Sequence, residues 1–194
     1  MCQLLEVGSQ METRSHASHW LKLGCGAALL LTVWAANWAI QEFGVVSIPF
    51  GLTAPAGVYF AGLAFGLRDV LHEVGGGKWV VAAILAGTAL SYVLSDGAEI
   101  PGGMVSIAAA SAAAFLLSEF ADFAVYSPLR RRHWTAAAVG SNLIGAVVDS
   151  AVFLWLAFGS LEFIEGQIVG KMLMVLPVLP VLYWARRRVR GPAD

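Results

Sequence analysis

The stretch WTAAAVGSNLIGAVVDSAVFLWLAF, residues 134–158, contains a single ionisable side chain, Asp149. A helix needs roughly 20 predominantly apolar residues to cross a bilayer. The apolar residues here run continuously and do not alternate with polar ones, as they would in a strand of a membrane β-barrel. The stretch therefore predicts a membrane-spanning helix that carries a carboxylate in its interior.

The whole chain shares the apolar character of this stretch. Of its 194 residues, 58% are hydrophobic and 13% are charged, and the mean hydropathy is +0.73. Soluble domains usually carry about 25% charged and about 45–50% apolar residues. The composition thus excludes an ordinary soluble enzyme and a disordered chain. The net charge of −1 provides no basic field for nucleic acid, and the two cysteines form no CxxC metal pattern.

Five further apolar runs bring the predicted number of spans to six. These runs are residues 21–40, 45–67, 79–94, 100–126 and 167–184. Pro49 and Pro55 predict an irregular first part of the second run, because proline removes a backbone donor. Residues 68–78 are interpreted as a short charged loop, and strands are not expected. The predicted fold class is an all-α membrane protein, a six-transmembrane-helix bundle.

Charge placement orients the six predicted spans. When both termini are cytoplasmic, the inner segments hold 11 of the 12 Lys and Arg residues, and the outer loops carry only acidic residues. This asymmetry satisfies the positive-inside rule. The predicted organisation is a cytoplasmic tail over residues 1–19, a six-span domain over residues 20–185 and a basic cytoplasmic tail over residues 186–194.

Polar residues inside the predicted spans are the candidate functional groups. A charge at the centre of a span costs about 2.5–3.5 kcal/mol on insertion scales, so such residues usually face the bundle interior. Asp149 shares a helix face with Asn142 and Phe153, which suits a planar, hydrogen-bonding ligand. The alternative is a purely structural pair of Asp149 with Lys171. Gln167 and Lys171 lie four residues apart, and the alternative for Lys171 is snorkelling to the surface.

Two acidic pairs lie near the inner ends of predicted spans. Glu119 and Asp122 indicate ligand or proton handling, or alternatively an interfacial turn that pairs with the arginines at 130–132. Asp69 and Glu73 are candidates for gating or proton coupling, together with Asp122. The alternative for Asp69 and Glu73 is a solvated loop with internal ion pairs.

No motif indicates an enzyme. The chain has no GxGxxG, P-loop or HExxH sequence. The sequence Gly140-Ser141-Asn142 lacks the second glycine of a nucleophile elbow, and the four histidines all lie in predicted tails or loops. We therefore predict no catalytic residue, no metal site and no cofactor.

Four segments, in order, resemble motifs of the queuosine precursor transporter family, also called the VUT family. These segments are DVLHEVGG at 69–76, AFLLSEFAD at 114–122, Ser141-Asn142 with Asp149-Ser150 and Phe153, and Gln167 with Lys171. The resemblance covers roughly residues 56–180. His72 and Gly75 depart from the family pattern, in which asparagine and an aromatic residue are common at these positions, and this departure bears on the substrate.

The resemblance implies a bacterial inner-membrane uptake protein for 7-deazaguanine precursors, such as 7-cyano-7-deazaguanine or 7-aminomethyl-7-deazaguanine. It also implies a fold similar to the substrate-binding subunits of energy-coupling-factor transporters. The leading hypothesis is a stand-alone secondary transporter, and no sequence feature separates it from the first of the alternatives. The alternatives are a capture subunit of a vitamin transporter with a separate ATPase complex, a ligand-free assembly protein and, last, an intramembrane enzyme.

The residues themselves suggest one binding site. Its predicted lining residues are Phe115, Glu119, Asn142, Asp149, Phe153, Gln167 and Lys171. A carboxylate accepts hydrogen bonds from adjacent N–H groups of a base, an amide serves a carbonyl edge, and aromatic rings stack on the heterocycle. The expected partners are a nucleobase and membrane lipid, with no nucleic acid. A second copy of the chain and an energising complex are further candidates.

Overall fold

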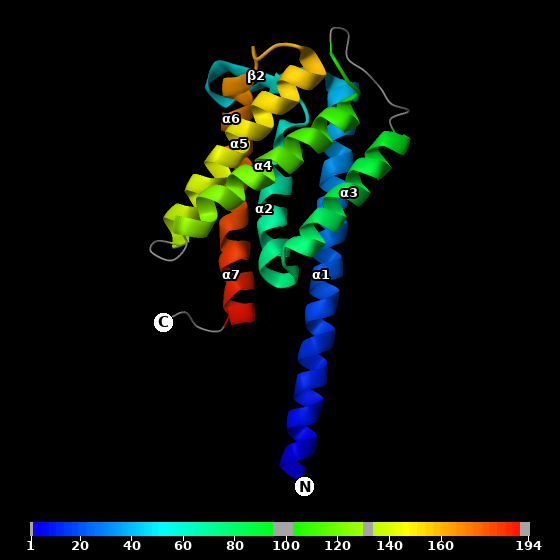
Figure 1. Cartoon of the computed structure of the whole chain (residues 1–194), viewed down its shortest axis with the longest axis vertical. Helices are drawn as coiled ribbons and strands as arrows, with labels where there is room; N and C mark the ends of the chain where they lie inside the picture. Colours follow the sequence, from blue (N-terminus) through cyan, green and yellow to red (C-terminus); the bar gives the residue numbers. More distant parts are fainter. Residues whose placement is uncertain (1, 95–102, 130–133, 191–194) are drawn as a thin grey trace.

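The computed structural model describes residues 2–94, 103–129 and 134–190 and is mostly helical (Figure 1). The first five helices are α1 (Cys2–Phe43), α2 (Val58–Gly75), α3 (Gly77–Leu94), α4 (Ile107–Leu129) and α5 (Trp134–Phe158). The last helix has two parts, α6 (Ile164–Val175) and α7 (Leu179–Arg190), which a short 3-10 turn at Leu176–Val178 joins. Pro177 and Pro180 lie at this junction. The helix is interrupted here because proline has no backbone N–H group to donate.

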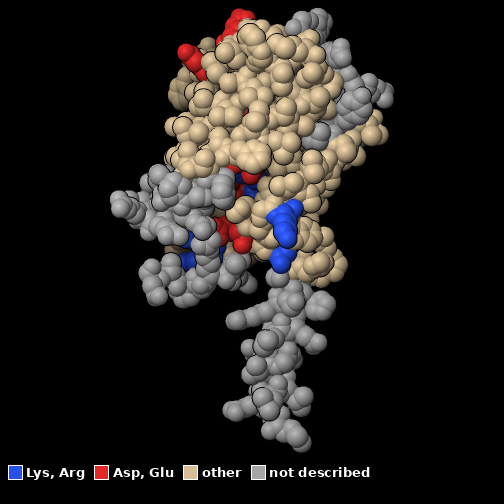
Figure 2. Space-filling view, viewed as in Figure 1, with Lys and Arg blue, Asp and Glu red and all other residues tan. Residues whose placement is uncertain are grey.

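Three stretches of the described residues are long and apolar enough to cross a membrane. They are His19–Phe43, Val139–Phe158 and Ile164–Arg187, and a shorter apolar helix covers Gly77–Gly87. Figure 2 shows a broad surface without charged groups, with acidic atoms at one end and both kinds of charge beyond the other. These features indicate a multi-pass membrane protein, whereas the count of six spans and their orientation stay predictions.

The prediction that the chain contains no strands is wrong at residues 45–55. Strands β1 (Val45–Ile48) and β2 (Leu52–Pro55) form an antiparallel hairpin in which Val45 faces Pro55 and Ile48 faces Leu52. The turn at Pro49–Gly51 places Phe50 at a φ of 69° and Gly51 at a φ of 73°. Residues 45–55 are not α-helical, as Pro49 and Pro55 predict, but strands of four residues are too short to show an alternating pattern.

The prediction of a charged loop over residues 68–78 is also wrong. Helix α2 continues through this segment to Gly75, and Gly76 ends it with a φ of 79° and an N–H group that donates to the His72 carbonyl oxygen at 2.9 Å. Helix α3 then begins at once, at Gly77. The three glycines therefore mark a helix end, and the charged residues before them belong to a packed helix.

Two helix starts also differ from the sequence-based boundaries. Helix α1 begins at Cys2, where the sequence predicts a loose tail, and helix α4 begins at Ile107 rather than near residue 100. The division of the chain into tails and a central domain stays a prediction.

Glycines bring α2 against α6 and the 3-10 turn that follows it. A Cβ atom at Gly62 would lie 2.6 Å from the backbone oxygen of Lys171, and one at Gly66 would lie 2.7 Å from Cβ of Val178. On the facing helix, a Cβ atom at Gly170 would lie 2.6 Å from a methyl carbon of Val58. Such spacing of small residues lets helices approach closely. This close packing sets the position of the Lys171 backbone relative to α2.

Candidate functional site

A pocket lies between helices α1 to α6. Its cavity volume is about 60 Å³, and it is partly open to the surroundings. A cavity needs about 10–15 Å³ to hold one water molecule, so this pocket has room for several. Its wall is predominantly apolar, with a few polar groups. The polar lining residues are Asn37, Ser111, Asp149, Gln167 and Lys171, and the aromatic ones are Phe65, Phe115 and Phe153.

The structure brings five of the seven predicted site residues to this pocket. They are Phe115, Asp149, Phe153, Gln167 and Lys171. Glu119 and Asn142 do not line it and belong to a second polar cluster, which is described below. The seven residues therefore lie in a pocket and a neighbouring charge cluster, and their role in binding stays a prediction.

Lys171 is buried and paired rather than snorkelling. Its side chain is 1% exposed, and its Nζ atom donates to Asp149 Oδ2 at 2.6 Å and to Ser150 Oγ at 2.8 Å. The structural alternative, a pair of Asp149 with Lys171, is thus formed. In the described part of the chain, Asp149 Oδ1 and one of the three Nζ protons have no bond. The pair can therefore stabilise the bundle and still offer an acceptor and a donor to a ligand.

Two amide side chains in the pocket wall are incompletely bonded. Asn37 and Gln167 are each 2% exposed. Ser111 Oγ donates to Asn37 Oδ1 at 2.7 Å, but among the described residues Asn37 Nδ2 and Gln167 Oε1 have no partner. A buried polar atom without a partner costs about 1–3 kcal/mol, so a hydrogen bond to a ligand would stabilise each of these two atoms. The sequence analysis missed Asn37 and Ser111, whose only signal is that each is a lone polar residue in an apolar run.

Aromatic rings form one wall of the pocket. The rings of Phe65 and Phe115 stack with their centroids 5.7 Å apart and their planes at 20°. Phe65 also lies beneath the guanidinium group of Arg68, whose Cζ atom is 5.1 Å from the ring centroid. Phe65 therefore separates the pocket from the second cluster. The sequence analysis missed this residue because nothing distinguishes it from an ordinary core phenylalanine.

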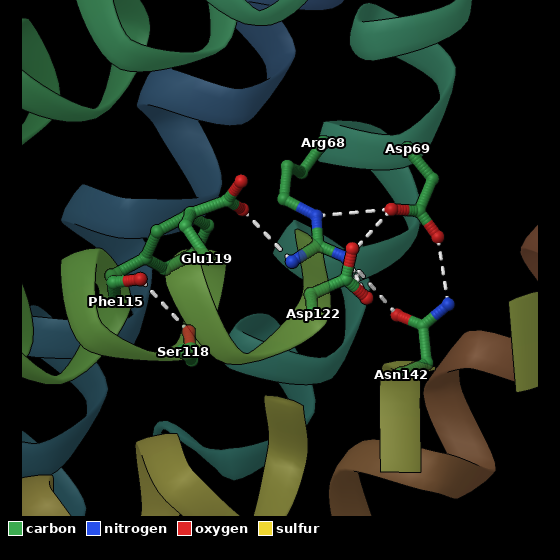
Figure 3. Close-up of polar contacts among 7 residues, drawn as sticks. All are labelled: Arg68, Asp69, Phe115, Ser118, Glu119, Asp122 and Asn142. Carbon is green, nitrogen blue, oxygen red and sulfur yellow. Dashed lines mark hydrogen bonds and ion pairs between the residues drawn. The ribbon is translucent and has the colours of Figure 1, made fainter. Parts of the chain in front are cut away.

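The second cluster, called the Arg68 cluster, consists of Arg68, Asp69, Glu119, Asp122 and Asn142 (Figure 3). Arg68 is 2% exposed, and its Nε and Nη2 atoms donate to Asp69 Oδ1 at 3.0 and 2.7 Å. Its Nη1 atom donates to Glu119 Oε1 at 2.8 Å, and Nη2 lies 3.4 Å from Asp122 Oδ1. Asn142 donates to Asp69 Oδ2 at 2.7 Å. The cluster joins α2, α4 and α5.

The Arg68 cluster contains one cation and three carboxylates, so its formal charge is −2 when all of them are ionised. The side chains of the acidic residues are 17–23% exposed, which gives them partial access to water. The prediction that Arg68 is a loop cation is wrong. Glu119 and Asp122 lie within helix α4 and pair with Arg68, and the side chains of the arginines at 130–132 lie outside the described residues.

Glu73 lies apart from the Arg68 cluster. Its Oε1 atom is 3.8 Å from Nη1 of Arg186, which links α2 to α7. The side chains of Asp69 and Glu73 are 17% and 7% exposed, so the alternative of a solvated loop for these residues is wrong. Whether Asp69, Glu73 or Asp122 takes part in gating or proton coupling stays a prediction.

One known protein family matches most of the chain. The family described as "Putative vitamin uptake transporter" matches residues 55–185. The match begins after Asn37 and contains every other polar residue of the pocket wall. Among the curated proteins and the solved structures, none matches. The chain therefore belongs to this vitamin uptake transporter family, an assignment that is consistent with a protein that is not an enzyme.

Proposed function

We propose that the chain is an uptake transporter of the bacterial inner membrane that carries a flat, hydrogen-bonding heterocycle of the 7-deazaguanine class. The observation that carries this proposal is the pocket, in which aromatic rings face the Asp149–Lys171 pair and two incompletely bonded amides. A deazaguanine has a flat ring that suits the aromatic wall. Its amino and ring N–H groups suit a carboxylate, and its carbonyl oxygen suits an amide or ammonium donor.

The pocket also argues against a ligand-free assembly protein. In such a protein, the polar groups in the membrane would all bond to one another, because unbonded ones are expensive there. Asn37 Nδ2 and Gln167 Oε1 have no such bond within the described part of the chain. A ligand that fills the pocket gives both atoms a partner.

The proposal is tested by ligand binding to the purified full chain in detergent. The unfolding temperature is measured with 7-cyano-7-deazaguanine, 7-aminomethyl-7-deazaguanine, riboflavin, biotin and thiamine. A ligand at 100 times its Kd stabilises the native state by about 2.7 kcal/mol, and we expect this stabilisation with the deazaguanines. A shift with a vitamin and none with a deazaguanine would refute the substrate class.

A pair of variants locates the site. Asp149→Asn removes the charge that faces Lys171, and we expect it to abolish the ligand-induced shift. Glu165→Gln makes the same chemical change at an exposed position near the start of α6 and is the matched control. If Asp149→Asn binds the deazaguanines normally, the pocket is not the binding site.

Transport is then measured in cells. Uptake of a deazaguanine by a host that lacks any energising ATPase complex supports the stand-alone transporter. Uptake that appears only when such a complex is supplied identifies the chain as a capture subunit instead.

A further inference from the structure

We propose that Asn37 is a specificity-determining residue which, together with Gln167, recognises a lactam edge, meaning a ring carbonyl beside a ring N–H group. This inference rests on the proposed function in that it concerns the same pocket, and it specifies which part of the substrate is recognised. Asn37 lies on α1, outside the residues that the family match covers. Selectivity for the substrate therefore depends on a helix outside the matched segment.

The two unbonded atoms are chemically complementary to such an edge. Asn37 Nδ2 is a donor and Gln167 Oε1 is an acceptor, and both are buried without a partner among the described residues. A lactam presents an acceptor next to a donor, so one ligand edge can satisfy both atoms. An edge that carries an amino group and an unprotonated ring nitrogen offers the opposite order, so a ligand held in the same orientation leaves both atoms unsatisfied.

A neighbouring hydroxyl group supports the Asn37 amide. Ser111 on α4 donates from Oγ to Asn37 Oδ1 at 2.7 Å, which leaves Nδ2 as the amide atom available to a ligand. Ser111 is therefore a positioning residue. Side chains held in this way by a supporting hydrogen bond discriminate between ligands better than mobile ones.

The backbone that carries Asn37 is also held in place. At Gly57, just before α2, a Cβ atom would collide with the backbone oxygen of Ala36 and would lie 3.0 Å from Cδ1 of Ile40. This close approach clamps α1 against the start of α2 on both sides of Asn37. The donor is thus presented by a fixed segment, as selective recognition requires.

The test compares two probes that differ at this edge. 7-Deazaguanine has the ring carbonyl and the adjacent N–H group, whereas 7-deaza-2,6-diaminopurine has an amino group and an unprotonated ring nitrogen there. Affinities for both are measured by calorimetry on the purified full chain. We expect the chain to prefer 7-deazaguanine by at least about tenfold, because a site built to hydrogen-bond one edge rejects the analogue that lacks it.

Asn37→Asp replaces the donor by an acceptor without changing the size of the side chain. We expect this variant to lower the preference for 7-deazaguanine by about tenfold or more. Gln41→Glu makes the same amide-to-carboxylate change one turn later on α1, at an exposed position, and should leave the preference unchanged. If Asn37→Asp does not fold, Ser111→Ala releases the amide while keeping Asn37, and it should lower the same preference by a smaller factor.

The outcomes separate this inference from the proposed function. If Asn37→Asp and Ser111→Ala weaken both probes equally, or neither, Asn37 has no role in selectivity and the inference is overturned. Riboflavin also has a ring carbonyl beside an N–H group. If the chain binds riboflavin but neither probe, and Asn37→Asp abolishes riboflavin binding, the deazaguanine proposal fails and this inference stands. Binding of thiamine alone, which lacks such an edge, or binding of no probe overturns it.

Discussion

Replacing Arg68 by methionine should destabilise the protein strongly. The substitution keeps an unbranched stem, two atoms shorter than that of arginine, but leaves three carboxylates without their shared cation. Removing one partner from a buried ion pair typically costs 3–5 kcal/mol, because the remaining charge stays buried and unpaired. The acidic side chains here are 17–23% exposed, so water recovers part of this cost. We therefore expect a loss near the lower limit, about 3 kcal/mol.

The loss is measured as a shift in the unfolding temperature of the purified chain in detergent. For 150–250 residues, 1 kcal/mol corresponds to a shift of about 2–4 °C, so Arg68→Met should unfold about 6–12 °C lower than the wild type. Arg187→Met is the matched control. Arg187 is exposed on α7, and its Cζ atom lies 4.7 Å from the ring centroid of Tyr183. Its loss should shift the unfolding temperature by less than about 3 °C.

A second substitution tests whether charge is the cause. Because the Arg68 cluster has more acids than bases, neutralising one acid should reduce the damage. Arg68→Met combined with Glu119→Gln should therefore be more stable than Arg68→Met alone. A double variant that is less stable than the single one, or an Arg68→Met chain as stable as the wild type, would refute the electrostatic account.

Three further predictions concern the same framework. Asp122→Asn should leave the unfolding temperature unchanged or raise it. The reason is that Asp122 Oδ1 is buried 3.4 Å from Arg68 and has no hydrogen bond among the described residues. A clear decrease in the unfolding temperature would contradict the excess of negative charge assigned to the Arg68 cluster. Gly62→Ala should destabilise the protein by about 1–3 kcal/mol in thermal unfolding, because the new Cβ atom would lie 2.6 Å from a backbone oxygen. Gly24→Ala is the control and should not destabilise the protein, because a Cβ atom there would have nothing within 4 Å. Lys171→Met should destabilise by about 3–5 kcal/mol, and adding Asp149→Asn should recover part of the loss; strictly additive losses would show that the two residues are not coupled.

The apolar runs predict most of the helices, and the polar residues within these runs predict part of the pocket lining. A run of about 20 apolar residues has few stable conformations other than a helix, and a polar residue within it is driven towards the protein interior. These two constraints explain why Asp149 from one run and Gln167 and Lys171 from another meet at one pocket. Each of these residues was recognisable because it is polar within an otherwise apolar run, where burying a polar group costs free energy.

The Arg68 cluster could not be predicted in the same way. Orientation by the positive-inside rule assigns every cation between two apolar runs to a loop, and the glycines at 75–77 reinforce that assignment for Arg68. What makes Arg68 a buried residue is its partners on other helices, Glu119 on α4 and Asn142 on α5. Such pairings depend on how the helices pack, which no local pattern encodes.

Helix α2 connects the two polar regions. Gly62 lies against the backbone of Lys171, Phe65 lines the pocket, and Arg68 follows one turn later with its guanidinium group over the Phe65 ring. Successive positions are three residues apart, so they lie on neighbouring turns along one side of the helix. Arg68 also bonds to Glu119 on α4 and to Asn142 on α5. Phe65 therefore contacts both the pocket and the side chain whose bonds join these three helices.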